Sequence, residues 1–177
     1  DAQHRLETAV MHAAERWRDT LIETPDRLAE FVVRHPAAAA RNLHTLLRSA
    51  AQLPAHLLKV ERLSARSGIP ARSVERYLTL FEHIFLLKRI PAWSNQATTR
   101  TVHMSKVLWV DTGLCARLQE RSLKRLLRDD AAVGPLVENF VLGELGRQCG
   151  WSRHAPSMMH YRTHDGFEVD AVLRGGD

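Results

Sequence analysis

The last 17 residues of the chain, 161–177, limit its fold more than any other segment. An Asp-Gly pair at 165–166 is typical of a tight turn between two antiparallel strands. Beyond the turn, apolar residues alternate with Glu168 and Asp170, which is the two-residue period of a strand. The pattern therefore predicts a hairpin that carries two carboxylates on one face. Its strands are expected at 158–163 and 167–173.

The composition is that of a globular protein from the cytoplasm. With 177 residues and 45% hydrophobic content, the chain can bury one large core or two small ones. Its apolar runs are far shorter than the roughly 20 residues of a membrane span, so we expect no membrane partner. Cys115 and Cys149 stand alone, which fits a reduced protein without disulfides or a zinc module. A start without Met or an apolar signal core indicates a piece of a longer protein.

Positive charge is concentrated in the middle of the chain. The formal net charge of the whole chain is +5. Residues 60–106 contain eight Lys or Arg against three Glu, so this stretch carries the whole excess. A basic patch confined to one module indicates an acidic partner such as nucleic acid, and a solvated helix face is the alternative. The basic residues are Arg62, Arg66, Arg72, Arg76, Lys88, Arg89, Arg100 and Lys106.

The same stretch has the layout of a winged helix-turn-helix. A short helix is expected at 63–66, a tight turn at 68–70 and a second helix at 71–83, which would enter the major groove. A strand at 84–90 and a returning strand at 99–104 would form the wing. The residues expected to contact nucleic acid are Arg72, Ser73, Arg76, Lys88 and Arg100.

Further elements are expected on both sides of this stretch. Helical spacing predicts three helices in the first third of the chain, at 11–21, 24–35 and 38–51. An apolar strand is expected at 106–110, followed by Asp111 as the N-cap of a helix. A strongly amphipathic helix is expected at 134–148. Its predicted buried residues are Leu136, Phe140, Val141, Leu142 and Leu145.

Four segments, in this order along the chain, resemble one protein family. They are residues 73–91, 105–114, 134–145 and 160–173. Together they are similar to the C-terminal region of a large prokaryotic family of AAA-type ATPases, a region known as domain of unknown function 4143. The resemblance implies an ATPase domain ahead of this region, with a Gly-rich phosphate loop for ATP. No such loop stands in this sequence, so ATP is expected to bind the missing domain and not this chain.

The resemblance also implies a restriction-endonuclease-like module in the last part of the chain. In that fold a helix glutamate, a strand aspartate and a following Glu-x-Lys gather one or two divalent metal ions. Glu138 and Asp170 match the first two positions, with Glu168 beside them, and would bind Mg²⁺ and activate a water molecule. The lysine-bearing strand is not in the sequence, so this piece is expected to be inactive alone. In the structural alternative, Glu138 caps its helix and Asp170 pairs with Arg162 across the hairpin.

We therefore expect an α+β fold in three parts. These are a helical segment at 1–58, similar to an ATPase lid or linker, a winged helix-turn-helix at 59–106 and a partial nuclease-like module at 107–177. The expected function is that of the DNA-binding and regulatory region of a cytoplasmic AAA-type ATPase. Double-stranded DNA, the ATPase domain and further copies of the chain are the expected partners. The alternatives are a Mg²⁺-dependent nuclease and an inactive nuclease-like domain that binds a protein.

Overall fold

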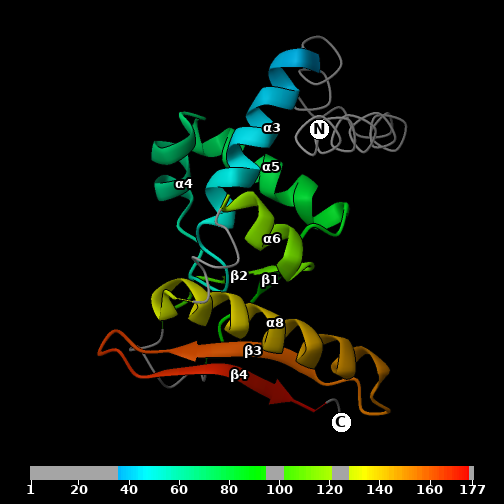
Figure 1. Cartoon of the computed structure of the whole chain (residues 1–177). Helices are drawn as coiled ribbons and strands as arrows, with labels where there is room; N and C mark the ends of the chain where they lie inside the picture. The colour runs from blue at the N-terminus through cyan, green and yellow to red at the C-terminus, as the bar shows by residue number, and fades with distance from the viewer. Residues whose placement is uncertain (1–35, 95–101, 121–127, 176–177) are drawn as a thin grey trace. The chain divides into compact units, whose positions relative to one another are not determined.

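The computed structural model describes residues 36–94, 102–120 and 128–175, which contain five helices and four strands (Figure 1). The elements are α3 (Pro36–Ala51), α4 (Val60–Ser67), α5 (Ala71–His83), β1 (Leu87–Ile90), β2 (Lys106–Trp109), α6 (Thr112–Leu118), α8 (Asp130–Trp151), β3 (Ser157–Arg162) and β4 (Glu168–Arg174). The predicted α+β class is confirmed. The helices expected at 11–21 and 24–35 lie outside the described residues.

The described elements divide into two compact units. The first, here called the helical unit, holds the described residues 36–50 and 60–84. The second, here called the mixed unit, holds residues 51–59 and the described residues from 85 to 175. Strand β1 therefore belongs to the mixed unit, whereas α4 and α5 belong to the helical unit.

Within the helical unit, α4 and α5 are the two helices that the sequence predicts on either side of a tight turn. Gly68 between them has a φ of +70°, a left-handed conformation that glycine adopts without strain. The Ser64 hydroxyl donates to the Ile69 carbonyl oxygen at 2.6 Å and so fixes the turn. The buried residues of α5 are Val74, Tyr77, Leu78, Leu80 and Phe81.

Strand β2 is the central strand of the mixed unit. It pairs antiparallel with β1, with Ile90 opposite Lys106. On its other edge, the segment 55–58 forms backbone hydrogen bonds of 2.8 to 3.0 Å with β2 and the residue before it. All four residues of β2 are buried, as expected for a strand that is covered on both faces.

The prediction of a returning strand at 99–104 is wrong for the residues that the structure describes. Residues 102–104 form no strand, and 99–101 lie outside the described residues. The partner of β1 is instead β2. The run Val-Leu-Trp in β2 buries far more apolar surface against the core than residues 102–104 could, which favours this pairing.

Strands β3 and β4 form the hairpin that the sequence predicts. Gly166 in the turn has a φ of +93°, which explains the glycine at that position. A register shift sets two residues of β4, Asp170 and Ala171, opposite the single residue His160 of β3. Such a β-bulge interrupts strict alternation. As a result, Asp170 contacts Lys106 and the next residue, Ala171, also packs inward against the core.

Carboxylates cap the two described helices that follow β2. Asp111 accepts a hydrogen bond from the Leu114 N–H at 2.8 Å, which confirms it as the N-cap of α6. Asp129 accepts one from the Ala132 N–H at 3.2 Å. Because of this second cap, α8 begins at Asp130 rather than at residue 134 as predicted.

Helix α8 lies along β3 and β4 and also contacts β2 (Figure 1). It thereby covers the core of the mixed unit. The core cluster consists of Ala55, Ile90, Leu108 and Leu142, with Met158 and Ala171 packed against it.

Among the described residues, no helix combines the length and the apolar character needed to cross a bilayer.

The sequence-based prediction of the buried face of α8 is partly wrong. Leu136 and Leu142 are buried as predicted, and Leu145 is partly buried. Phe140 and Val141 are each more than half exposed. The buried face follows the 3.6-residue period of the helix, and these two residues fall outside it. Its fully buried members are Leu136, Asn139, Leu142 and Cys149.

Asn139 is a polar residue within this buried face. Its Oδ1 accepts from the Trp109 N–H at 2.8 Å, and its Nδ2 donates to the Trp109 carbonyl oxygen at 3.0 Å. The same Nδ2 donates to Thr112 Oγ1 at 2.8 Å. The amide therefore pairs with the backbone at the end of β2 as a neighbouring strand would, and it holds α8 against β2 and α6.

We expect the Asn139→Ala variant to lose about 3 kcal/mol of unfolding free energy, because the buried N–H and C=O of Trp109 would each lack a partner at a cost of roughly 1–3 kcal/mol. Chemical denaturation followed by tryptophan fluorescence measures this loss. The matched control is Gln148→Ala, an exposed position of the same helix, which should stay within about 0.5 kcal/mol of the wild type. Equal stability of the two variants would contradict the role of Asn139.

Candidate functional site

Lys106, the first residue of β2, is buried inside the mixed unit. Its side chain is only 2% exposed. Its backbone lies between Ile90 of β1 and Leu57, with which it forms a β-bridge. A lysine is almost never fully buried unless its ammonium group is paired.

Three carboxylates surround the Lys106 ammonium group. Its Nζ lies 2.8 Å from Glu138 Oε1, 2.8 Å from Glu168 Oε1 and 2.7 Å from Asp170 Oδ1. Glu138 comes from α8, and the other two acids come from β4. The structure therefore brings together the three acids that the sequence singles out. We call Lys106 and these three acids the Lys106 cluster. The side chains of Glu138, Glu168 and Asp170 are 30%, 31% and 55% exposed, so the cluster is open to solvent on its carboxylate side.

Two more side chains border the Lys106 cluster. Arg162 Nη1 donates to Glu168 Oε2 at 2.9 Å. The alternative that pairs Arg162 with Asp170 is wrong, because Glu168 lies directly opposite Arg162 and the bulge brings Asp170 to Lys106. His160 is buried beside them, and its Nε2 is 2.9 Å from the Met104 carbonyl oxygen.

The surroundings of the cluster shift several pKa values. Burial is the largest influence on Lys106 and lowers its pKa, but hydrogen bonds to the three carboxylates, led by Asp170, outweigh it and the net pKa is raised. For Asp170, the hydrogen bond from Lys106 is the largest influence and lowers the pKa below 3.8. For Glu138, burial is the largest influence and raises the pKa above 4.5. Burial lowers the pKa of His160, so its ring is neutral at neutral pH.

The cluster combines three negative charges with one buried positive charge. Carboxylates are the ligands that Mg²⁺ prefers, and the binding of Mg²⁺ by these acids stays a prediction. All three acids lie within hydrogen-bonding distance of the Lys106 ammonium nitrogen. Across residues 36–94, 102–120 and 128–175, no group of three or more His, Cys, Asp or Glu side chains is arranged to hold a metal ion. The arrangement fits an internal ammonium group, which pairs with all three acids.

Lys106 is the residue of the site that sequence interpretation misses, because the sequence places it in the basic stretch 60–106. The one sequence feature that indicates a buried Lys106 is its position at the start of the apolar run Lys-Val-Leu-Trp. A charged residue in a strand that is otherwise apolar needs a buried partner. Its burial also makes the basic surface of this stretch smaller than the sequence indicates.

The residues predicted to contact nucleic acid fall in different parts of the chain. Arg72 is exposed at the start of α5, and Ser73 and Arg76 are partly buried in the same two turns. Lys88 is exposed on β1, in the mixed unit. Arg100 lies outside the described residues.

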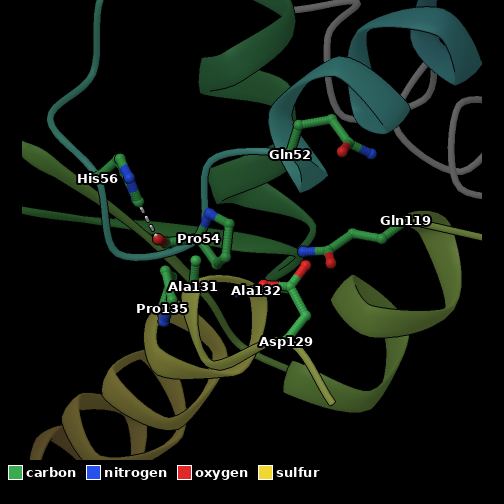
Figure 2. A pocket seen from close by; sticks show the side chains of 8 residues that line it. All are labelled: Gln52, Pro54, His56, Gln119, Asp129, Ala131, Ala132 and Pro135. Atoms are coloured by element: carbon green, nitrogen blue, oxygen red, sulfur yellow. Dashed lines mark hydrogen bonds between the residues drawn. The ribbon is translucent and has the colours of Figure 1, made fainter. Parts of the chain in front are cut away.

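A separate pocket of about 200 Å³ lies at the start of α8 (Figure 2). It is smaller than the roughly 300–1,000 Å³ of common ligand pockets. Two of its polar side chains bond to the backbone, His56 Nδ1 with the Pro54 carbonyl oxygen at 2.7 Å and Gln119 Nε2 with the Ala51 carbonyl oxygen at 2.8 Å. None of the predicted site residues lines it. Its lining residues are Gln52, Pro54, His56, Gln119, Asp129, Ala131, Ala132 and Pro135.

Comparison with known proteins supports the family resemblance for only part of the chain. The domain of unknown function DUF4143 matches residues 133–177, the segment with β3, β4 and most of α8. The earlier segments, at 73–91 and 105–114, lie outside this match and inside that of a different family. These matches show no ATPase.

Two curated proteins share short segments with the chain. The dual-action ribosomal maturation protein DarP of Pasteurella multocida is 38% identical over 48 residues, which are 27% of this chain and 27% of that protein. DarP of Cupriavidus metallidurans is 37% identical over 46 residues, which are 26% of this chain and 23% of that protein. The chain thus spans about a quarter of the length of these relatives. No solved structure matches it.

A second family model covers more of the sequence. The domain of unknown function DUF8612 matches residues 28–125, which are more than half of the chain and include α3, α4, α5 and α6. The chain therefore belongs to the DUF8612 family.

Proposed function

We propose that the mixed unit is a non-catalytic binding module in which the Lys106 ammonium group replaces the divalent cation of a nuclease-like site. The observation that carries this proposal is the position of Lys106 Nζ, 2.7 to 2.8 Å from all three carboxylates. An ammonium group balances negative charge, but it does not generate a hydroxide from bound water as a metal ion does. The module would then serve as the regulatory, partner-binding part of a larger ATPase, the context that the resemblance of its last part suggests.

A divalent cation could enter this cluster only if the ammonium group moved away or lost its proton. Movement is opposed by the burial of the Lys106 side chain, which is only 2% exposed. Loss of the proton is opposed by the raised pKa of Lys106. Both barriers support a permanent ammonium group in the module.

We expect the Lys106→Met variant to lose about 2–3 kcal/mol of unfolding free energy, below the roughly 3–5 kcal/mol for breaking a fully buried ion pair, because the acids are partly exposed and regain water. We also expect Mn²⁺ to raise the melting temperature of this variant, because its three carboxylates lose the ammonium group that lies between them. The wild type should show no such rise. Calorimetric melting with and without Mn²⁺ measures both effects.

The matched control is Lys88→Met, which removes an exposed lysine from the neighbouring strand and should behave as the wild type does. The proposal would be overturned if the wild type bound Mn²⁺ with an affinity that Asp170→Asn abolishes. Metal-dependent cleavage of DNA by the wild type, lost in the same variant, would overturn it as well.

The free energy of unfolding of the module should fall at acid pH, because Asp170 becomes protonated there. Its folded pKa is depressed, so its contribution is present above the ordinary value of 3.8 and is lost as the pH falls through the folded pKa. We therefore expect the wild type to be more stable than Asp170→Asn above pH 3.8, and this difference to shrink at lower pH. Denaturant titrations at a series of pH values measure it. A difference that does not change with pH would show that Lys106 does not hold the Asp170 carboxylate.

As a second function, we propose that the helical unit binds duplex DNA through α5. The observation in its favour is the helix-turn-helix with Gly68 at its turn and an exposed Arg72 at the start of the second helix. Arg62 and Arg66 are exposed on α4 and add positive charge to the same unit. The presence of Glu75 on α5 limits this charge, so binding is expected to be moderate and to weaken with salt.

We expect the Arg72→Ala variant to bind a labelled DNA duplex more weakly and with a salt dependence reduced by about one phosphate contact. Fluorescence anisotropy across a salt series measures both quantities. Arg128→Ala removes an exposed arginine of the mixed unit and serves as the control. An RNA duplex is the comparison ligand, because the two curated relatives are ribosomal maturation proteins. Equal binding by Arg72→Ala and Arg128→Ala would contradict the assignment.

A further inference from the structure

Helix α8 carries apolar side chains on the side that faces away from the core as well as on its buried side. Val137, Phe140 and Val141 are each more than half exposed, and Trp151 is 79% exposed. Large apolar side chains on the outer side of a surface helix are normally covered by a partner. The four side chains expose apolar surface on the order of 400 Å², which is within the range of patches that mark interaction sites.

The outer face of α8, defined here as these four residues with Glu144 and Arg147, has a regular pattern along the helix. Its apolar residues lie at the two ends, with Val137, Phe140 and Val141 toward the N-terminus and Trp151 at the C-terminus. The middle is charged, because Arg147 pairs with Glu144. At 1.5 Å per residue, the face is about 21 Å long.

We propose that this face binds the same face of a second copy of the chain, with the two α8 helices antiparallel and Glu144 next to the two-fold axis. A two-fold interface requires a surface that is complementary to itself. In the antiparallel register, Trp151 of one copy packs against Val137 and Phe140 of the other. Arg147 of each copy then faces the Glu144 carboxylate of the other.

The size of the outer face supports this choice of partner. Two apolar faces of this size, with the charged residues between their ends, bury close to the roughly 1,000 Å² that a specific interface needs. The charge pattern also favours a second copy, because reversal of the helix direction places the two neighbouring Glu144 carboxylates between the two Arg147 side chains, one from each copy. A partner without a central ion pair would leave Glu144 and Arg147 partly desolvated.

Single cysteines test the register directly. Because the Glu144 residues of the two copies would lie side by side, we expect Glu144→Cys to form a disulfide-linked dimer under mild oxidation. Asp130→Cys lies at the start of the same helix, and its two copies would be roughly 40 Å apart in the antiparallel register, so it should stay monomeric in denaturing gels. The native Cys115 and Cys149 are buried and should not interfere. Efficient cross-linking through Asp130→Cys, with none through Glu144→Cys, would overturn the antiparallel arrangement.

Sedimentation equilibrium tests the dimer itself. We expect the wild type to dimerise reversibly and Phe140→Glu to raise the dissociation constant at least about 30-fold, the loss expected for an interface hot spot. Phe167→Glu, at an exposed phenylalanine outside α8, is the matched control and should dimerise as the wild type does. Circular dichroism verifies that both variants fold. A monomeric wild type, or a dimer that is insensitive to Phe140→Glu, would overturn the proposal.

Discussion

The contact between the Lys106 ammonium group and three carboxylates is the interaction on which the mixed unit depends. One buried charge at the start of β2 is shared by an acid of α8 and two acids of β4, so it joins a strand, a helix and a hairpin that lie far apart in the sequence. A buried ammonium group without these partners would be strongly unfavourable, and three neighbouring carboxylates without the ammonium group would repel one another. Each side therefore needs the other. The cost of desolvation is moderate, because the three acid side chains are partly exposed and water still reaches part of every carboxylate.

Two local features bring the acids to Lys106. The Asn139 amide pairs with both backbone groups of Trp109 and fixes α8 along β2, which sets the position of Glu138 one residue earlier. The bulge in β4 places Asp170 and Ala171 opposite one residue of β3, so that Asp170 can contact the ammonium group while its neighbour packs on the core. Neither feature contributes chemistry to the cluster. Both decide whether its carboxylates converge.

Much of this architecture follows from patterns that are local in sequence. The Asp-Gly turn, the strands beside it, the two helices on either side of Gly68 and the Asp111 cap all depend on neighbours within a few residues, and the structure confirms them. The strand partner of β1 and the outward position of Phe140 could not be predicted in this way, because they depend on which distant apolar segments bury one another. The alternation beyond the Asp-Gly turn predicts the two acids of β4 and the resemblance adds Glu138, whereas neither indicates Lys106. Its role depends on groups 32 and 64 residues further along the chain, which no local pattern records.

We propose that the Lys106 ammonium group permanently fills the place of a metal ion in this module. The most direct measurement is anomalous diffraction from wild-type crystals grown with Mn²⁺ in excess. We expect no manganese peak among Glu138, Glu168 and Asp170, and electron density for the Lys106 side chain that reaches all three carboxylates. A manganese peak bound by these acids, with the Lys106 side chain displaced from them, would contradict the claim.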